Sequence, residues 1–323
     1  MKRIVVNEPG GPECLTLVDA PTPDPGSGDV LVALAASGVN FIDVYFRMGL
    51  YPADRPMALG SEGAGVVERV GREVAGLKPG DRVAYAMVRG SYAEYAVVPA
   101  AQLVKIPDGV ETETAAAVML QGMTAHYLTH STFPLERGQT CLVHAAAGGT
   151  GGLIVQMAKH RGARVLGTAS TDEKADAARA LGADEVIVYA HEEFETEVKR
   201  LTDGRGVDVV YDSVGRATFD KSLRVIRPRG LMALFGQSSG PVPPVDPTIL
   251  NTCGSLFLTR PSLGHYVATR EELQWRASDV LGMVRSGALS VRISGVYTLA
   301  DAAQAHRDLE ARKTLGKYLI RTA

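Results

Sequence analysis

Short runs rich in β-branched and aromatic residues, each ended by glycine or proline, fill the first third of the chain. Runs of this length between turn-forming residues are typical of strands. The pattern predicts strands at residues 3–6, 15–18, 29–36, 63–70, 82–85 and 93–98. We therefore expect a mostly antiparallel, all-β domain over this third.

After residue 106 the pattern becomes helical. Asp108-Gly109-Val110-Glu111 resembles a capping box, and the alanine-rich run behind it predicts a helix to about His130. From about residue 140 strands alternate with helices: strands at 141–145, 164–169, 185–189, 207–211 and 231–235, and helices at 151–161, 173–181, 192–201 and 218–225. Such alternation is typical of a parallel, doubly wound α/β sheet.

The last 70 residues return to a mixed pattern. They predict a strand at 255–259, helices at 270–286 and 301–311, and a strand near 291–296. This tail is expected to fold back onto the first domain. The strand at 255–259 is expected to pair across a dimer.

Length and charge narrow the class of protein. A chain of 323 residues fits two domains of ordinary size, each with its own core. Hydrophobic residues make up 46% of it and the formal net charge is only -2, so no basic field is present to hold nucleic acid or an anionic membrane. The expected partner is a small molecule.

Targeting and redox signals point to the cytoplasm. The first residues lead into Pro9-Gly10-Gly11-Pro12 without a long apolar stretch, and no run of about 18 apolar residues occurs. The three cysteines, Cys14, Cys141 and Cys253, are far apart and odd in number, which argues against a disulfide framework. A reducing compartment is expected.

The clearest chemical signal is a glycine-rich turn. The pattern Ala146-x-Gly148-x-x-Gly151 lies between a predicted strand and a predicted helix. The first small residue permits the tight turn, the second admits a pyrophosphate, and the third allows close packing of helix and strand. A flexible Ala-Gly loop is the alternative, but the strand–turn–helix setting favours a dinucleotide site.

The end of the next predicted strand indicates which dinucleotide binds. An NAD site places an acidic residue there, whereas this chain reads Gly167-Thr168-Ala169-Ser170-Thr171. Ser170 can donate a hydrogen bond to a 2′-phosphate, and Lys174 adds positive charge. NADPH is therefore preferred, provided that Asp172 and Glu173 point outward.

The ordered motifs along the chain resemble those of the zinc-free quinone oxidoreductases, the zeta-crystallin-like family of the medium-chain dehydrogenase/reductase superfamily. They span nearly the whole length. The matching segments are Gly38-Val39-Asn40-Phe41-Ile42-Asp43, Gly49-Leu50-Tyr51-Pro52, Gly60-Ser61-Glu62-Gly63-Ala64-Gly65, Lys78-Pro79-Gly80-Asp81-Arg82-Val83, 144–151, Tyr211-Asp212-Ser213-Val214-Gly215, Phe235-Gly236-Gln237-Ser238-Ser239-Gly240 and Thr259-Arg260-Pro261-Ser262.

This resemblance implies a GroES-like catalytic domain over residues 1–122, completed by 265–323, and a Rossmann NADP(H)-binding domain over 123–264. It also implies a homodimer. The cofactor contacts that it implies are Asn40, Phe41, Ile42, Asp43, Tyr45, Thr124, Gly148, Gly149, Thr150, Ser170, Lys174, Tyr189, Val214, Phe235, Gly236, Gln237, Ser238, Ser262, Leu263 and Arg312. Arg312 suits a phosphate if the tail folds back, and is otherwise a solvated charge.

Zinc is not expected. Zinc-dependent relatives carry a cysteine in the segment that reads Gly38-Val39-Asn40 and a histidine directly before Glu62, where this chain has Ser61. A catalytic zinc needs about three protein ligands. His126 and His130 have the i,i+4 spacing of a metal pair, but without a third ligand they are better interpreted as ordinary histidines near a helix end.

Without zinc, the acceptor must take hydride readily by itself, as a quinone does. Tyr45 and Tyr51 are candidate proton donors or stacking groups, or else ordinary half-buried tyrosines, and Asn40 is a candidate hydrogen-bonding group. Gln121 and His126 replace a lysine and a tyrosine usual in the family. These departures bear on the contacts with the electron acceptor more than on those with the cofactor. The alternatives are an enoyl or α,β-unsaturated carbonyl reductase, and a non-enzymatic crystallin-like or RNA-binding role.

Overall fold

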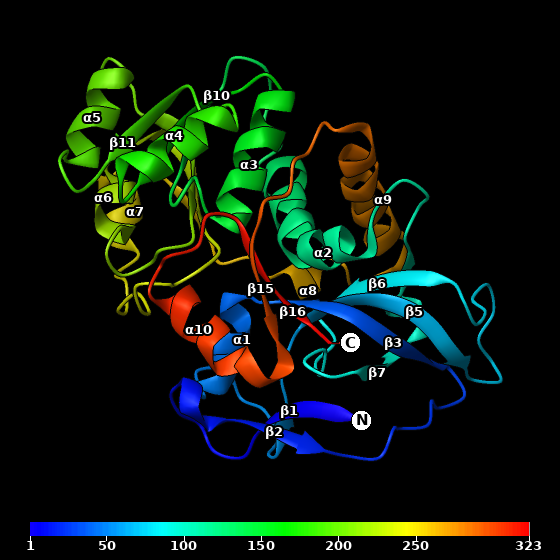
Figure 1. Cartoon of the computed structure of the whole chain (residues 1–323). Helices are drawn as coiled ribbons and strands as arrows, with labels where there is room; N and C mark the ends of the chain where they lie inside the picture. The colour runs from blue at the N-terminus through cyan, green and yellow to red at the C-terminus, as the bar shows by residue number, and fades with distance from the viewer. Residues whose placement is uncertain (323) are drawn as a thin grey trace. The chain divides into compact units, whose positions relative to one another are not determined.

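The chain forms two units in the computed structural model, which describes residues 1–322 (Figure 1). Unit 1 comprises Met1–Met123, Tyr266–Gly287 and the described part of Val291–Ala323. Unit 2 comprises Thr124–His265 and Ala288–Ser290. The C-terminal tail and the N-terminal third thus belong to the same unit.

Unit 1 is built on two sheets. The larger has the order β15-β16-β3-β5-β6-β8, with β7 also paired to β3, and the smaller has the order β2-β1-β4. The strands are β1 (Lys2–Val6), β2 (Leu15–Asp19), β3 (Asp29–Gly38), β4 (Met57–Ala58), β5 (Glu62–Val70), β6 (Arg82–Ala86), β7 (Tyr95–Pro99), β8 (Val104–Lys105), β15 (Ile293–Thr298) and β16 (Lys317–Arg321).

Strand β3 is the centre of this unit because it pairs with β5, β7 and β16, all antiparallel. Val30, Val32 and Leu34 alternate along it and pack into one core with Val67 and Val83. Side chains of a strand alternate between the two faces of its sheet, so this period of two buries one apolar face. The prediction of a mostly antiparallel β domain is confirmed, with β15 and β16 as a parallel pair.

Four helices accompany these sheets: α1 (Phe41–Arg47), α2 (Thr112–Tyr127), which ends in unit 2, α9 (Arg270–Ser286) and α10 (Ala302–Glu310). Helices α1 and α10 lie side by side (Figure 1), and Arg47 of α1 forms an ion pair of 2.8 Å with Glu310 of α10. Short 3-10 turns occur at Pro12–Cys14, Ala100–Gln102 and Leu299–Asp301.

Unit 2 contains a six-stranded sheet of order β11-β10-β9-β12-β13-β14 in which every neighbouring pair is parallel. The chain winds outward from β9 in both directions, as a doubly wound sheet requires. Its strands are β9 (Thr140–Val143), β10 (Arg164–Ala169), β11 (Glu185–Val188), β12 (Val207–Asp212), β13 (Ile226–Leu234) and β14 (Phe257–Thr259). Its helices are α3 (Gly149–His160), α4 (Asp172–Ala180), α5 (Phe194–Leu201), α6 (Phe219–Leu223), α7 (Thr248–Thr252) and α8 (Leu263–Tyr266), which ends in unit 1.

The central strands of this sheet are buried on both faces. All residues of β9 and β12 are buried, as expected for parallel strands that helices cover on both faces. The predicted doubly wound α/β fold is confirmed.

Several details differ from the expectations, among them the short elements β4, β8, α7 and α8, which were not predicted. The proposed capping box is wrong: Gly109 has a φ of +83° in a turn, and α2 begins only at Thr112. The last turn of the same helical segment, Leu128–Thr132, is a π-helix. Strand β16 was not expected from the sequence. No helix within residues 1–322 is long and apolar enough to cross a membrane.

Candidate active site

The glycine-rich turn of unit 2 connects β9 to α3. A Cβ atom placed on Gly151 would lie 2.2 Å from the carbonyl oxygen of Ala145, so only glycine lets the helix start this close to the turn. Gly148 is the N-cap of α3 and, with Gly149 and Thr150, is half-buried. The first N–H groups of a helix have no acceptor within it, so the start of α3 can hold a phosphate.

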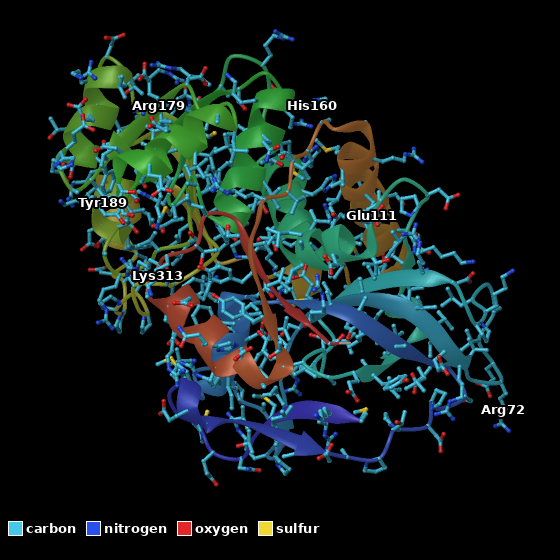
Figure 2. All side chains as sticks on the ribbon, viewed as in Figure 1. Arg72, Glu111, His160, Arg179, Tyr189 and Lys313 are labelled. Atoms are coloured by element: carbon cyan, nitrogen blue, oxygen red, sulfur yellow. The ribbon has the colours of Figure 1, made fainter. Side chains whose placement is uncertain are left out.

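At the end of β10 a serine stands where an NAD site would have a carboxylate. Ser170 follows the strand and Lys174 lies in the first turn of α4; both are half-buried. Asp172 and Glu173 are exposed to solvent, which screens their charge. Tyr189, labelled at the surface in Figure 2, is 48% exposed, and its backbone N–H donates to the carbonyl of the last residue of β10 at 3.1 Å.

The ends of β12 and β13 lie together in the same unit. The carboxylate of Asp212 accepts hydrogen bonds from the backbone N–H groups of Val214 (2.6 Å) and Gly215 (3.1 Å). The backbone N–H of Phe235 donates to the carbonyl of Asp212 at 2.8 Å. Val214 is therefore brought beside the segment that contains the predicted contacts Phe235, Gly236, Gln237 and Ser238.

Three more of the predicted contacts lie elsewhere. In unit 2, Ser262 is exposed and Leu263 is buried at the start of α8, while Thr124 is buried in α2. The carboxyl ends of neighbouring parallel strands in unit 2 carry most of the predicted dinucleotide contacts, which is where doubly wound sheets bind ligands.

Asn40 begins α1 in unit 1. Its backbone N–H donates to the carboxylate of Asp43 at 3.0 Å, which caps the helix. Phe41 and Ile42 follow and are half-buried, whereas Asp43 is completely buried. These four residues, all predicted cofactor contacts, therefore form the cap and first turn of a short helix.

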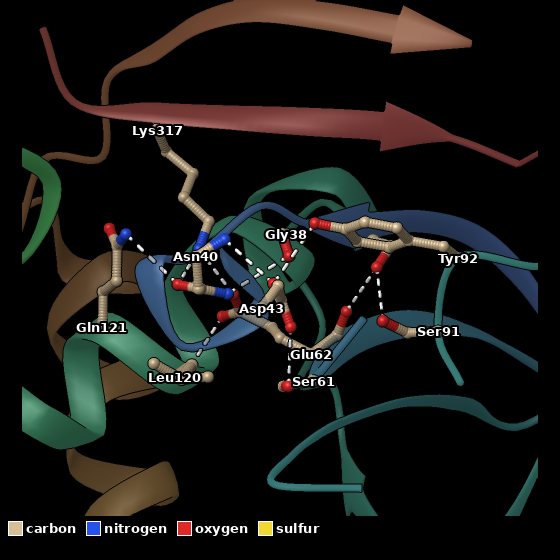
Figure 3. A network of polar contacts seen from close by, with 11 residues as sticks. Gly38, Asn40, Asp43, Ser61, Glu62, Ser91, Tyr92, Leu120, Gln121 and Lys317 are labelled. Atoms are coloured by element: carbon tan, nitrogen blue, oxygen red, sulfur yellow. Dashed lines mark hydrogen bonds and ion pairs between the residues drawn. The ribbon is translucent and has the colours of Figure 1, made fainter. Parts of the chain in front are cut away.

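The side chain of Asn40 is fully occupied by hydrogen bonds (Figure 3). Its Oδ1 accepts from Lys317 Nζ at 2.7 Å and from Gln121 Nε2 at 3.3 Å. Its Nδ2 donates to Glu62 Oε2 at 2.9 Å and to the carbonyl of Gly38 at 3.1 Å. Because two donors and two acceptors are all used, Asn40 orients its neighbours and has no amide group left for a ligand in this conformation.

Lys317 and Glu62 form a buried ion pair within 2.6 Å, with side chains 1% and 0% exposed. The second carboxylate oxygen of Glu62 accepts from the backbone N–H of Leu120 at 2.6 Å. Burial lowers the pKa of Lys317, and the Glu62 carboxylate opposes that shift. A Cβ on Gly38 would lie 2.1 Å from Glu62 Oε2, so this glycine makes room for the pair.

A second buried chain of polar groups starts from Asp43. Its carboxylate accepts from Ser61 Oγ at 2.7 Å and from the Tyr92 hydroxyl at 3.2 Å. Tyr92 Oη lies 3.1 Å from His306 Nε2, and His306 Nδ1 lies 3.2 Å from Arg47. Since arginine can only donate, Nδ1 of His306 accepts and its Nε2 carries the proton. Arg47 therefore donates to His306, His306 donates to Tyr92, and Tyr92 donates to Asp43.

Burial determines the protonation states of Asp43, Tyr92 and His306. It raises the pKa of Asp43 to about 6, against the hydrogen bonds from Ser61 and the backbone of Asn40. It also raises the pKa of Tyr92, with Asp43 adding to the shift, and lowers the pKa of His306 to about 3. His306 and Tyr92 are therefore neutral at pH 7.

The two tyrosines predicted as candidate donors lie against each other. The rings of Tyr45 and Tyr51 are 5.5 Å apart and edge-on, and Tyr51 also meets Phe46 at 5.6 Å. Tyr45 is only 8% exposed, whereas Tyr51 is half-buried. Tyr51 is thus the more accessible of the two rings.

The remaining candidates are dispersed. Arg312 is exposed between α10 and β16, with a φ of +56°. His126 and His130 stack in unit 2 with ring centroids 4.1 Å apart. Within residues 1–322 no group of three or more His, Cys, Asp or Glu side chains is placed to hold a metal ion.

Sequence reasoning missed the groups that organise unit 1. Lys317 lies 277 residues from Asn40 along the chain, and Tyr92 lies 214 residues from His306. Lys317, Tyr92 and His306 belong to none of the matched motifs. The pairing of β16 with β3 brings Lys317 to Asn40, and the placement of α10 brings His306 to Tyr92. Glu62 was part of a matched motif, but nothing in the motif indicated its partner.

Comparisons with known proteins agree with both units. Residues 26–108 match the alcohol dehydrogenase GroES-like domain, and residues 149–278 match the family described as zinc-binding dehydrogenase. A quinone oxidoreductase of Pseudomonas aeruginosa is 48% identical over 99% of both chains.

Solved structures are equally similar. A mycobacterial protein complexed with NADPH has a TM-score of 0.97 and 50% identity, with 99% of this chain and 100% of the other covered. A quinone oxidoreductase of Escherichia coli complexed with NADPH has a TM-score of 0.98 and 42% identity over 99% and 100% of the two chains.

Replacing Asp43 with asparagine should remove a pH dependence of stability. The ordinary pKa of an aspartate is 3.8, and the folded-state pKa is about 6, so between these values the unfolded chain has lost a proton that the folded chain keeps. Stability from this group is complete below the lower value and is lost as pH rises through the higher one. Relative to Asp43→Asn, the native protein should therefore be more stable at pH 4 than at pH 7 by about 2–3 kcal/mol.

Urea unfolding at each pH, followed by the fluorescence of Trp275, measures this difference, since the chain has one tryptophan and it lies in α9 of unit 1. A difference between the two proteins that does not change with pH would contradict the assignment.

Proposed function

This chain belongs to the quinone oxidoreductase family of the medium-chain dehydrogenase/reductase superfamily, and from that premise we propose that it is an NADPH-dependent quinone reductase. The glycine turn at α3, closed to any side chain at Gly151, is the observation that carries the dinucleotide part. NADPH, when bound, supplies the hydride. The proposal that the acceptor is a quinone rests on the similarity to the quinone oxidoreductases named above.

We place the phosphates and the adenosine of NADPH in unit 2. The N–H groups at the start of α3 face a pyrophosphate, and Ser170 and Lys174 hold the 2′-phosphate, where an NAD site would have a carboxylate. The exposure of Asp172 and Glu173 supports this choice. Tyr189, beside the end of β10, is available to stack on the adenine.

Zinc independence rests on the chemistry of the side chains at the two expected ligand positions. Asn40 offers an amide that is already saturated, and Ser61 offers a hydroxyl that donates to Asp43 at 2.7 Å. Neither is a good zinc ligand. The positive charge nearest to Asn40 and Glu62 is instead the ammonium of Lys317.

Hydride transfer to a quinone must be completed by a proton. Tyr51, half-buried against Tyr45 and Phe46, can stack on a planar acceptor or donate through its hydroxyl. The quinone needs no Lewis acid, because its own carbonyls accept the negative charge. The contribution of unit 1 is therefore alignment and hydrogen bonding.

We also propose a homodimer formed through β14. This strand is the free edge of the sheet of unit 2, and it exposes Phe257 (62%) and Leu258 (36%). An exposed apolar edge strand is a ready site for pairing with a second copy.

The cytoplasm is the compartment that the cysteines favour. Cys14, Cys141 and Cys253 are all free, and burial raises the pKa of Cys141 to about 12, which leaves it as an inert thiol. Fractionation of the source cells tests this placement.

The decisive test of function is NADPH oxidation by the purified protein against a panel of quinones and enones, with a metal chelator present throughout. We expect turnover with quinones at undiminished rate after chelation. Turnover with enones alone would overturn quinone reduction, and loss of activity on chelation, restored by zinc, would overturn zinc independence.

Lys174→Ala should weaken NADPH binding about 10–100-fold, the worth of a hydrogen bond between charged groups, and leave NADH binding nearly unchanged. Titration of each cofactor by fluorescence measures both constants. Lys199→Ala is the matched control, because Lys199 is an exposed lysine of the same unit that pairs with Glu195. Equal losses for the two cofactors would refute the role of Lys174.

Phe257→Asp should convert the dimer to a monomer by placing a charge on the pairing edge. Sedimentation equilibrium at micromolar concentration distinguishes the two states. Val296→Asp is the control, since Val296 is 45% exposed on β15, the edge strand of the large sheet of unit 1. A native protein that sediments as a monomer would contradict the proposal.

A further inference from the structure

We propose that Gln121 is a specificity-determining residue that contacts a carbonyl oxygen of the electron acceptor, and that Lys317 is a positioning residue that holds it through Asn40. This inference rests on the proposed quinone reductase function. It begins from the chain of contacts Lys317–Asn40–Gln121 in Figure 3.

The orientation of both amides follows from the ammonium. Lys317 can only donate, so the oxygen of Asn40 must face it, at 2.7 Å. The nitrogen of Asn40 then faces Glu62 Oε2 and the carbonyl of Gly38, which can only accept. The atom of Gln121 that meets Asn40 Oδ1 at 3.3 Å must therefore be Nε2.

This orientation leaves half of the Gln121 amide available. Among residues 1–322, the bond to Asn40 is the one hydrogen bond of its side chain, so Oε1 and the second N–H have no protein partner. Gln121 is half-buried, whereas Asn40, Glu62 and Lys317 are at most 3% exposed. Of the linked side chains, Gln121 is thus the one that a ligand can reach.

The support beneath Gln121 is rigid because four elements meet there. Lys317 lies on β16, Glu62 on β5, Asn40 at the start of α1, and Gln121 on α2. The backbone N–H of Leu120, the residue before Gln121, donates to Glu62 Oε1 at 2.6 Å. The carboxylate of Glu62 therefore anchors both the backbone of α2 and the ammonium of Lys317, which orients the side chain of Asn40.

A neutral amide suits an acceptor whose charge changes during the reaction. As hydride adds to a quinone, negative charge develops on a carbonyl oxygen, and a donated N–H bond stabilises it. A proton then reaches that oxygen from Tyr51 or water and gives the hydroquinone, whose hydroxyl can donate to Oε1. Gln121 itself neither gains nor loses a proton.

The test combines Gln121→Ala with removal of the positioning group. Lys317→Met alone would leave Glu62 charged, buried and unpaired, so the neutral pair variant Glu62→Gln/Lys317→Met is used beside it, with Lys317→Arg as the conservative variant. For each variant, and for the combination of Gln121→Ala with the pair variant, we measure kcat and KM for a quinone and the Kd of NADPH.

We expect Gln121→Ala to lower kcat/KM for the quinone about tenfold, the worth of one hydrogen bond, with the Kd of NADPH unchanged. The pair variant should show a similar loss, and adding Gln121→Ala to it should cause little more, because the two act as one unit. Lys317→Arg should recover part of the activity. The control is Lys105→Met on β8, which breaks an exposed ion pair of 2.9 Å with Asp81 and should have no effect.

Each other outcome overturns one part of the proposal. If Gln121→Ala leaves kcat/KM unchanged while the native enzyme reduces quinones, the acceptor contact is wrong and the proposed function stands. If the losses add, or if the pair variant fails to fold, Lys317 is a structural residue and not a positioning one. If the native protein reduces no quinone, the proposed function itself fails.

Discussion

The buried ion pair between Lys317 and Glu62 is the interaction on which unit 1 depends. Removing two charges from water costs several kcal/mol for each, and a pair repays that cost only when its remaining lone pairs and protons are also satisfied. Here the carboxylate receives the ammonium, the amide of Asn40 and the N–H of Leu120. Loss of one partner should cost about 3–5 kcal/mol, since the other charge would stay buried and unpaired. The pair thereby fixes β16, β5, the start of α1 and α2 at one point.

This anchoring gives the groups around Asn40 and Asp43 a defined geometry through hydrogen bonds and one ion pair. In a metal site the ion orients its ligands; in unit 1 the ammonium orients Asn40, and Asp43 orients Ser61 and Tyr92. The two acidic groups lie in different environments. Glu62 faces a cation, whereas the pKa of Asp43 is raised to about 6 by burial with only neutral donors in contact. The network is therefore sensitive to pH at Asp43 and held together electrostatically at Glu62.

Unit 2 depends on steric rather than ionic constraints. Gly151 lets α3 start against the turn, and Asp212 ties the end of β12 to the N–H groups that follow it. These constraints are local in sequence, which is why a short pattern is enough to indicate them. The difference between the units is one of range: the turn is built within a few residues, whereas the ion pair joins residues 255 positions apart.

The sequence by itself determined the longer elements and their order, because periodicity, glycine turns and strand–helix alternation are local properties. It also determined the dinucleotide turn and the absence of a carboxylate after β10, from which NADPH followed. Tertiary structure alone decided that Lys317 reaches Asn40, that Tyr92 meets His306, and that the amide of Asn40 is fully used while that of Gln121 is not. These contacts form when β16 pairs with β3 and α10 packs beside α1. The residues of each element do not indicate which distant element it will contact in the fold.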